Sequence, residues 1–270
     1  MITGLEAAID GVPCIERFRI NLTAQDNAVA CSDSAMAVLR SSSNKDWNAV
    51  VSAFGHTPAK LPNDKFTFTA RDADGQGWRS ETNGAIVRQA HVFCRPQSSE
   101  PFYYHLYISG NGSLTPGEYS ATGGSYPTPA SSIGRGVSID DTPLTGIAQW
   151  ELILSSNLAR PIWPAHKIGW PVRDSGNIDA EIVFRQHPDL VDDLPEIGDE
   201  AIYNLFVTDT LSWEIKWGKL LDLPVEYVVR NQNNEPEFVA AENRAHFSAS
   251  VGGQQGHILK PGAAQWWPFS

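Results

Sequence analysis

The acidic side chains have residue types suited to chemistry, but their spacing does not complete any familiar site. Asp72-x-Asp74-Gly75 resembles the start of a calcium-binding loop, yet the later oxygen ligands and the bidentate glutamate of such a loop are missing. The acid pairs at 140–141 and 192–193 would serve a glycosidase only if a cleft held two carboxylates several ångströms apart. We therefore expect Asp72 and Asp74 to lie in a hairpin turn and the acid pairs to lie in exposed loops.

The histidines and glycines do not form a catalytic or metal-binding pattern either. None of the seven histidines has the paired spacing of a zinc site, and His91 and His105 occur in segments that predict ordinary strand positions. A nucleotide-binding loop follows a strand and opens a helix, and Gly134-Arg135-Gly136 does neither in the predicted elements. The Gly-x-Ser-x-Gly motif is absent. The sequence thus predicts a protein that is not an enzyme, with no catalytic residue, no metal ion and no cofactor.

Cysteine usage and targeting signals indicate a reducing compartment. The three cysteines are Cys14, Cys31 and Cys94, whereas a disulfide framework would favour an even, matched number. Their alternation with apolar residues indicates small buried side chains in strands. The first residues lack the basic and apolar regions of a signal peptide, and no apolar run approaches the roughly 18 residues of a membrane span. We expect a soluble protein that folds in a cytoplasm.

Eight of the nine tryptophans divide into two groups by sequence context. Those in strand contexts are expected to be core residues: Trp47, Trp78, Trp150 and Trp213. The others lie in Pro/Gly-rich or terminal segments, where a solvent-facing ring forms either a sugar-binding platform or an anchor between subunits. The candidate subunit-interface residues are Trp163, Trp170, Trp266, Trp267 and Phe269.

Charge is distributed unevenly along the chain. Residues 1–135 contain 11 Lys and Arg against 12 Asp and Glu, while residues 136–270 contain 9 against 19, so the second half carries −10 of the total of −11. No Lys/Arg cluster of the kind that binds phosphates is present. High-affinity DNA binding is therefore not expected, and the acidic second half is either a solubilising surface or one that repels nucleic acid.

The period of apolar residues predicts strands rather than helices. Alternation over 15–23 is typical of a half-buried strand, and short strands recur at roughly 8–12-residue spacing. Further strands are predicted at 28–31, 35–39, 49–54, 66–70, 78–80 and 103–109. The best short helix candidates are 3–9 and 195–203. The fold class is therefore all-β, with few short helices and a sandwich or barrel in each half.

The second half reads as a diverged copy of the first. Segment 44–54 corresponds in order to 175–184, and strand 66–69 corresponds to 203–207. Trp78 lies 17 residues before Arg95, and Trp213 lies 17 residues before Arg230. Order and spacing thus predict a duplication. The predicted organisation is a first β-sandwich unit over 1–109, a Gly/Ser/Pro-rich loop and linker over 110–136 with one weak strand at 118–121, and a second unit over 137–270.

Asn44-Lys45-Asp46-Trp47 precedes an alternating strand and is followed by Gly55-His56-Thr57-Pro58, Pro62-Asn63-Asp64 and Phe66-Thr67-Phe68. In these segments the chain resembles bacteriophage virion structural proteins, in particular a duplicated tail-tube (major tail) protein. They are similar to the part of a tail-tube unit that introduces a substitution-tolerant β-hairpin and sandwich strands. The second half keeps Gly176-Asn177-Ile178-Asp179 but has Ile178 in place of the tryptophan and lacks the Gly-His-Thr-Pro run. The likeness is one of pattern and spacing over most of both halves, and its motifs are short.

The resemblance implies β units that join their sheets across subunits into rings. Two units in each chain would let three chains form the ring that six single units form. Stacked rings would make a tube with an acidic lumen for DNA, and loop 110–136 would be a subunit-joining arm. The implied partners are the protein itself as a trimeric ring, other virion proteins, and DNA as transient non-specific cargo, with no membrane. The implied location is the virion, after folding in the host cytoplasm.

Two other functions fit a duplicated, β-rich, acidic chain. A capsid decoration (cement) protein would assemble only on a shell and would be a compact monomer or trimer alone. A carbohydrate-binding or carbohydrate-cleaving β-sandwich of a receptor-binding protein would bring Trp163 and Trp170 together with an acid pair in one cleft. Imaging and mass measurement of the purified protein separate rings and tubes from both alternatives.

Overall fold

The structure is a computed structural model of the chain. It describes residues 8–9, 12–30, 37–72, 74–110, 113–120, 131–156, 178–186, 195–207, 212–222, 225–232, 235–251, 259–262 and 265–268. For residues 23–46 and for those after 215 the description is of the backbone.

Every regular element among these residues is a β-strand, which confirms the all-β prediction. The strands of the first half are β1 (Ala8–Ile9), β2 (Ile15–Ala30), β3 (Ala37–Phe54), β4 (Lys65–Phe66), β5 (Thr69–Arg71), β6 (Gln76–Ser80), β7 (Ala85–Cys94), β8 (Tyr103–Gly110) and β9 (Leu114–Glu118). Those of the second half are β10 (Val137–Ile139), β11 (Thr142–Pro143), β12 (Ile147–Ser156), β13 (Ile178–Gln186), β14 (Glu200–Phe206), β15 (Ser212–Asp222), β16 (Val225–Gln232), β17 (Glu235–Val251), β18 (Leu259–Gly262) and β19 (Gln265–Pro268).

The two short helices considered from the sequence are not present where the structure describes those segments. Residues 195–199 form a turn and residues 200–203 open β14. Ala201, Tyr203 and Leu205 are buried while their neighbours are more exposed, so burial follows the period of two that a strand requires. In the other candidate, Ala8–Ile9 is a strand and residues 3–7 lie outside the described part.

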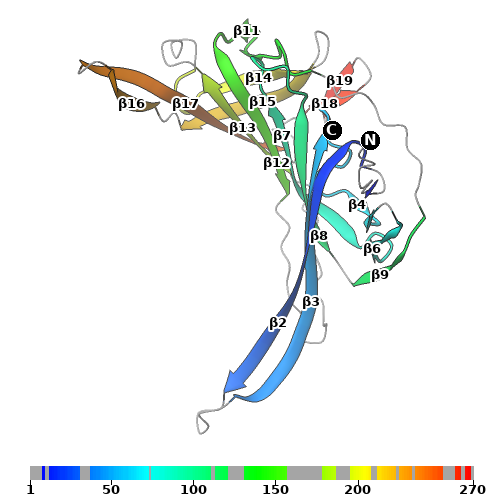
Figure 1. Cartoon of the computed structure of the whole chain (residues 1–270). Helices are drawn as coiled ribbons and strands as arrows, with labels where there is room; N and C mark the ends of the chain where they lie inside the picture. The colour runs from blue at the N-terminus through cyan, green and yellow to red at the C-terminus, as the bar shows by residue number, and fades with distance from the viewer. Residues whose placement is uncertain are drawn as a thin grey trace.

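One large antiparallel sheet runs through both halves of the chain. It has 13 strands in the order β11-β10-β14-β15-β17-β13-β12-β7-β8-β3-β2, with β16 paired to β17 and β4 paired to β7. Figure 1 shows this sheet passing from β2 and β3, in blue, through β7 and β12 to the second-half strands. The halves are therefore joined by strand pairing at β7 and β12.

A second, four-stranded sheet, β1-β5-β6-β9, covers the first half of the large sheet. The two layers meet in an apolar core, where Trp47 of β3 lies 5.2 Å from Phe68, ring centre to ring centre. A glycine is required beside this ring: a Cβ at Gly110, the last residue of β8, would lie 1.9 Å from Cε2 of Trp47. The first half is thus a two-layer sandwich.

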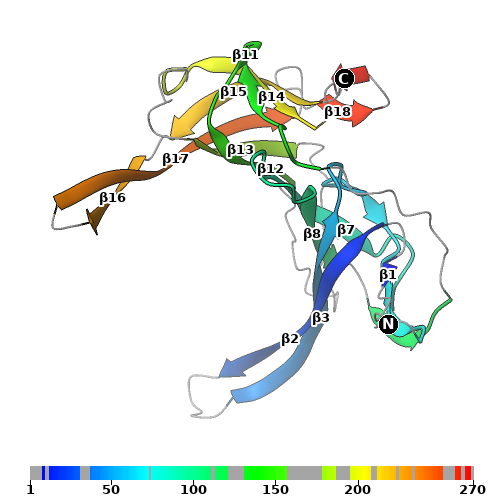
Figure 2. The same cartoon turned by 45° about the horizontal axis from the view of Figure 1, so that its top comes forward.

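Two long hairpins continue beyond the body of the large sheet. One is made by β2 and β3, which are 16 and 18 residues long, and the other by β16 with the first part of β17. Figures 1 and 2 show both as ribbons that leave the body. Because neighbouring strands are antiparallel throughout, the first hairpin leaves from one end of the sheet strands and the second from the opposite end. We call them the first arm and the second arm.

The two halves have corresponding strand orders. In the first half β2-β3-β8-β7 lie side by side in the large sheet, and β1-β5-β6 lie side by side in the facing sheet. In the second half, the run that matches β2-β3-β8-β7 is β12-β13-β17 followed by β15 and β16. The run that matches β1-β5-β6 is β10-β14-β15. The first residues of β15 pair mainly with β14 and its last residues pair with β17, so β15 belongs to both runs.

The Gly/Ser/Pro-rich segment is more ordered at its start than the sequence indicated. Its strand is β9 (Leu114–Glu118), which pairs with β6, rather than 118–121. After residues 121–130, which are outside the described part, the backbone N–H groups of Ser132 and Gly134 donate to carbonyl oxygens of Glu100 and Pro96. Residues 131–136 are thereby attached to the first half before β10 begins.

Candidate functional site

The predicted turn at Asp72 is confirmed. It joins β5 to β6, which pair antiparallel. The Asp72 carboxylate accepts hydrogen bonds from the backbone N–H groups of Asp74 and Gln76, at 3.0 and 2.9 Å. One of its oxygens is thus used to close the turn, as is typical of Asx turns. Within the described residues, no group of three or more His, Cys, Asp or Glu side chains has the geometry of a metal site.

Asp140 and Asp141 also lie in a turn, between β10 and β11. Both have positive φ, 46° and 66°, which suits the two central residues of a tight hairpin turn. The Asp140 carboxylate accepts a hydrogen bond from the backbone N–H of Ile202 at 2.9 Å, and both residues are exposed. The prediction of exposed loop acids is confirmed for this pair, while 192–193 lie outside the described residues.

The densest group of polar and aromatic side chains lies on β7, β8 and β12. Nε2 of His91 is 2.9 Å from Oε2 of Glu151, and the His91 ring lies 3.8 Å from that of Phe93. Phe93 stacks on Tyr103 at 4.5 Å and meets His105 edge-on at 5.0 Å. His91 and His105 thus occupy strand positions, as predicted, and the contact of His91 with Glu151 crosses between the halves.

Electrostatics favour the charged form of the Glu151 carboxylate in this contact. Burial alone would raise the pKa of Glu151, but the hydrogen bond and charge of His91, the Gln149 amide and the Arg185 guanidinium together hold it below its ordinary value. Burial lowers the pKa of His105, with the neighbouring His91 contributing. The hydrogen-bonded and stacked side chains join neighbouring strands of the two halves.

The junction between the halves is a strand pairing supported by side chains. Six residues of β12, from Trp150 to Ser155, pair with β7 residues from Cys94 to Gln89. The Trp150 indole N–H donates to the Arg135 carbonyl at 2.8 Å, and its ring packs 5.8 Å from that of Phe102. Further hydrogen bonds join the Gln89 amide to the Ser155 hydroxyl and the Ser156 hydroxyl to the Arg88 carbonyl, both 3.2 Å long.

In the described part of the chain, β2, β11 and β16 of the large sheet each pair with one neighbour, and the edges at β2 and β16 lie at the far ends of the runs that this junction joins. β2 is the last strand of the large sheet in the described part of the chain, and β16 pairs there with β17 alone. Open strand edges present N–H and C=O groups that invite pairing with another chain. The core-facing residues of β2 follow this edge, and Leu22 among them is 55% exposed.

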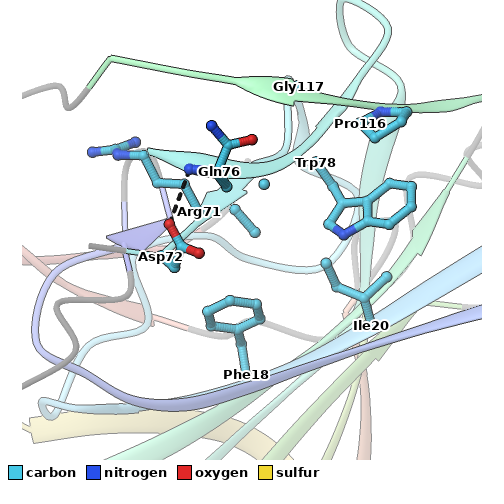
Figure 3. Close-up of a pocket in the computed structure, with 10 residues that line it drawn as sticks. Phe18, Ile20, Arg71, Asp72, Gln76, Trp78, Pro116 and Gly117 are labelled. Atoms are coloured by element: carbon cyan, nitrogen blue, oxygen red, sulfur yellow. Dashed lines mark hydrogen bonds between the residues drawn. The ribbon is translucent and has the colours of Figure 1, made fainter. Parts of the chain in front are cut away.

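A groove lies beside the open β2 edge. It has a volume of about 490 Å³ and lies between β2 and the hairpin of the facing sheet. In Figure 3, Phe18 and Ile20 project from β2 toward the Trp78 ring, with Pro116 beyond it and Asp72 and Gln76 at the other end. Trp78 is half-buried, so its assignment to the core is wrong, whereas Trp47, Trp150 and Trp213 are buried as predicted.

The predicted interface aromatics fall mostly outside the described part of the chain. Trp163, Trp170 and Phe269 lie outside the described residues. Trp266 and Trp267 lie in β19, which pairs with β18 through Lys260↔Trp267 and Pro261↔Trp266. Sequence reasoning missed Trp78 as a surface aromatic because its alternating context is the same as that of a core residue.

Two of the three cysteines lie in the described part of the chain. Cys94 is buried in β7, as expected of a small apolar side chain, and is free. Cys14 is not in a disulfide and is half-buried at the bend before β2, and Cys31 lies outside the described residues. Among those residues there is no helix of the length and hydrophobicity needed to cross a membrane.

Comparisons with known proteins return no match: no protein-family model and no curated protein sequence is similar to this chain.

Proposed function

We propose that this chain is a non-enzymatic structural protein of a phage particle. It assembles edge to edge with copies of itself into rings of three chains, and the rings stack into a tail tube for DNA passage. The observation that carries this proposal is the head-to-tail continuity of the large sheet, in which β12 of the second half pairs with β7 of the first. The phage setting and the ring of three come from the resemblance to duplicated tail-tube proteins.

The duplication is supported by the corresponding strand orders of the halves. β12 occupies in the second half the place that β2 occupies in the first, at the edge of the run that continues through β13 or β3. The facing runs β1-β5-β6 and β10-β14-β15 begin alike, since Ile9 pairs with Ala70 and Ile139 pairs with Tyr203. On this reading the internal junction joins the last strand of one unit to the first strand of the next.

If the contact of the internal junction is repeated between chains, each chain must offer one open edge like that of β12 and one like that of β7. The β2 edge corresponds to the β12 side of the junction, and the edge formed by the end of β15 and by β16 corresponds to the β7 side. A head-to-tail contact that repeats between chains closes into a ring when the rotation from one chain to the next is a whole fraction of a full turn. Otherwise it makes a helix. The same edge pairing, repeated three times between chains, would complete a ring of six units.

The register of this contact follows from the internal junction. On the β7 side, Leu106 of β8 pairs with Ala90, and Phe247 of β17 pairs with Leu220. Leu106 also pairs with Val51 of β3, and Phe247 also pairs with Ile182 of β13. Since Val51 and Ile182 correspond, Leu220 corresponds to Ala90. One position further along, Asp222 pairs with His246 and His91 pairs with His105, so Asp222 corresponds to His91.

On the β12 side, Leu154 pairs with Ala180 in β13, and Ile20 pairs with Ala49 in β3. Ile20 therefore corresponds to Leu154, which pairs with Ala90 across the junction. Applied between chains, the register places β2 of one copy against β15 of the next. Lys219 already pairs with Glu200 and Ser248, so the contact begins after it. The expected partners are Ile20 with Leu220 and Arg19 with Asp222.

The arms supply contacts for stacking. A two-stranded ribbon is marginally stable by itself in water, so hairpins of this length are typical of elements that pack on another chain. The two arms leave opposite ends of the sheet strands. In a stack, one arm of each chain would reach toward the ring above and the other toward the ring below.

Negative-stain imaging with mass determination tests the proposal. We expect rings or stacked tubes, and a species of three times the 29.6 kDa chain mass. A monodisperse single-chain particle would instead favour a capsid decoration protein or a glycan-binding module.

Cysteine cross-linking tests the register. The pair Arg19→Cys with Asp222→Cys, in a chain with Cys14 and Cys31 replaced by serine, should give chain-to-chain disulfides, because opposite residues of antiparallel strands have Cα atoms about 4.5–5.5 Å apart. Arg19→Cys with Leu220→Cys is the matched control, since Leu220 lies one register position away, opposite Ile20 rather than Arg19. Equal cross-linking of both pairs, or of neither, would contradict the proposed register.

A further inference from the structure

We infer that the groove at Trp78 is the seat for the second half of a neighbouring copy of this chain. This inference rests on the proposed head-to-tail assembly and identifies the surface that such an assembly would bury. Two comparisons within the chain carry it: the burial of β2 against that of β12, and the burial of Trp78 against that of Ile215.

The first comparison concerns the apolar residues of the corresponding edge strands. By the register above, Phe18 and Ile20 of β2 correspond to Leu152 and Leu154 of β12. The β12 pair is 0% and 2% exposed, whereas the β2 pair is only half-buried. The difference coincides with the junction, since β7 pairs with β12 and β2 has no second partner among the described residues. The groove beside Phe18 and Ile20 therefore lies where β2 lacks the neighbouring strand that β12 has in β7.

The second comparison concerns the hairpins β5–β6 and β14–β15. Ala70 pairs with Ile9 and Trp78, and Tyr203 pairs in the same way with Ile139 and Ile215, so Trp78 and Ile215 occupy corresponding places. Ile215 is 1% exposed, and Trp213, two residues before it, is 0% exposed. Its indole N–H approaches the His56 carbonyl at 3.4 Å, so the loop after β3 of the first half reaches across onto the second half. No described residue from another unit does the same for Trp78, which lines the open groove (Figure 3).

Both comparisons point to one occupant. The first half covers β12 and the β14–β15 hairpin inside the chain, so the corresponding cover for β2 and the β5–β6 hairpin is the second half of another copy. The apolar lining by Phe18, Ile20, Trp78 and Pro116 suits such burial, because aromatic residues in a desolvated pocket dominate the energy of most interfaces. Leu22, 55% exposed on the same face of β2, extends the surface toward the first arm.

A cysteine introduced into the groove reports whether assembly buries the groove, with little disturbance of the fold. Gln76 lines the groove and is exposed, so Gln76→Cys, with Cys14 and Cys31 replaced by serine, gives one accessible thiol there. We expect its reaction with a maleimide to slow by about tenfold or more when dilute single chains assemble. The matched control is Ile197→Cys, in an exposed turn of the second half, whose reaction rate should not change. Unprotected Gln76→Cys in assembled protein would overturn the inference.

A charge in the groove tests whether the contact is needed. Trp78→Glu should raise the concentration for half-assembly by about tenfold or more, because it buries an unpaired carboxylate at the contact, while Ile197→Glu should leave it unchanged. Thermal unfolding of the dilute variant shows whether the single chain still folds. If the Arg19–Asp222 cross-link forms but Trp78→Glu and thiol protection show no effect, the groove inference fails and head-to-tail assembly stands. If no multi-chain species and no cross-link form, both fail.

Discussion

Replacing Gly110 by alanine should destabilise the first half strongly. Gly110 ends β8 under the indole of Trp47, and an added Cβ would lie 1.9, 2.1 and 2.2 Å from Cε2, Nε1 and Cδ2 of that ring, where ordinary contact begins at 3.4 Å. The ring cannot move away easily, because Trp47 is 2% exposed and packs on Phe68 across the core. Overpacking of a dense core typically costs about 1–3 kcal/mol, and an overlap with a rigid ring belongs at the upper end.

The expected loss is about 3 kcal/mol, or about 6–12 °C in melting temperature for a chain of this size. Urea or thermal unfolding followed by tryptophan fluorescence measures it. Gly136→Ala is the matched control, since a Cβ there meets no atom within 4 Å, and it should be nearly neutral. Adding Trp47→Leu to Gly110→Ala should cost less than the sum of the single changes, because the smaller side chain removes the overlap. Equal stability of the two glycine variants would refute the reasoning.

Three further predictions concern the junction and its neighbourhood. Trp150→Phe should lower stability toward urea by about 1–3 kcal/mol, since the Arg135 carbonyl loses a buried donor; an unchanged midpoint would contradict this. Glu151 has a pKa held below its ordinary value of 4.5, so its contact with His91 stabilises the fold above that value and is lost as pH falls through the folded pKa. Melting temperatures measured between about pH 3 and 7 should therefore fall less steeply in acid for Glu151→Gln than for wild type; parallel curves would count against it. Burial raises the pKa of the Cys94 thiol to about 12, so alkylation read by mass spectrometry at about pH 8 should modify Cys94 only after unfolding, and labelling in the folded protein would show the thiol to be accessible.

Strand positions with apolar alternation could be predicted from the sequence, while long-range pairing could not. The prediction for 103–109 matches β8 because Tyr104, Leu106 and Ile108 are buried on one face. The strands predicted at 35–39 and 49–54 are instead one strand, β3. The polar residues between them carry no alternation signal, although their backbone continues to pair with β2.

The candidate surfaces were harder to predict because they depend on which strand lies at an edge. The residues of β2 and β12 have similar alternation, and only the pairing of β12 with β7 makes one strand internal and leaves the other at the edge. Trp78 and Trp213 likewise differ in exposure, although both were expected to be core residues of strands. The turn at Asp72, by contrast, was predictable, since Asp-x-Asp-Gly chemistry acts within a few residues.

Fusing two units in one chain has physical consequences for a ring. Half of the edge contacts become intramolecular and form at a high effective concentration, so three associations between chains, rather than six, incur the entropic cost of assembly. Fusion also lets the halves diverge, as they have in charge, −1 against −10, and in the end of the sheet from which each arm leaves. A ring built this way should have threefold rather than sixfold symmetry, with six similar β bodies and arms that alternate in direction. Rotational averaging of end-on ring images tests this: sixfold images in which all arms point to one side would mean that the halves are interchangeable and that the two-armed chain described here is not the unit of assembly.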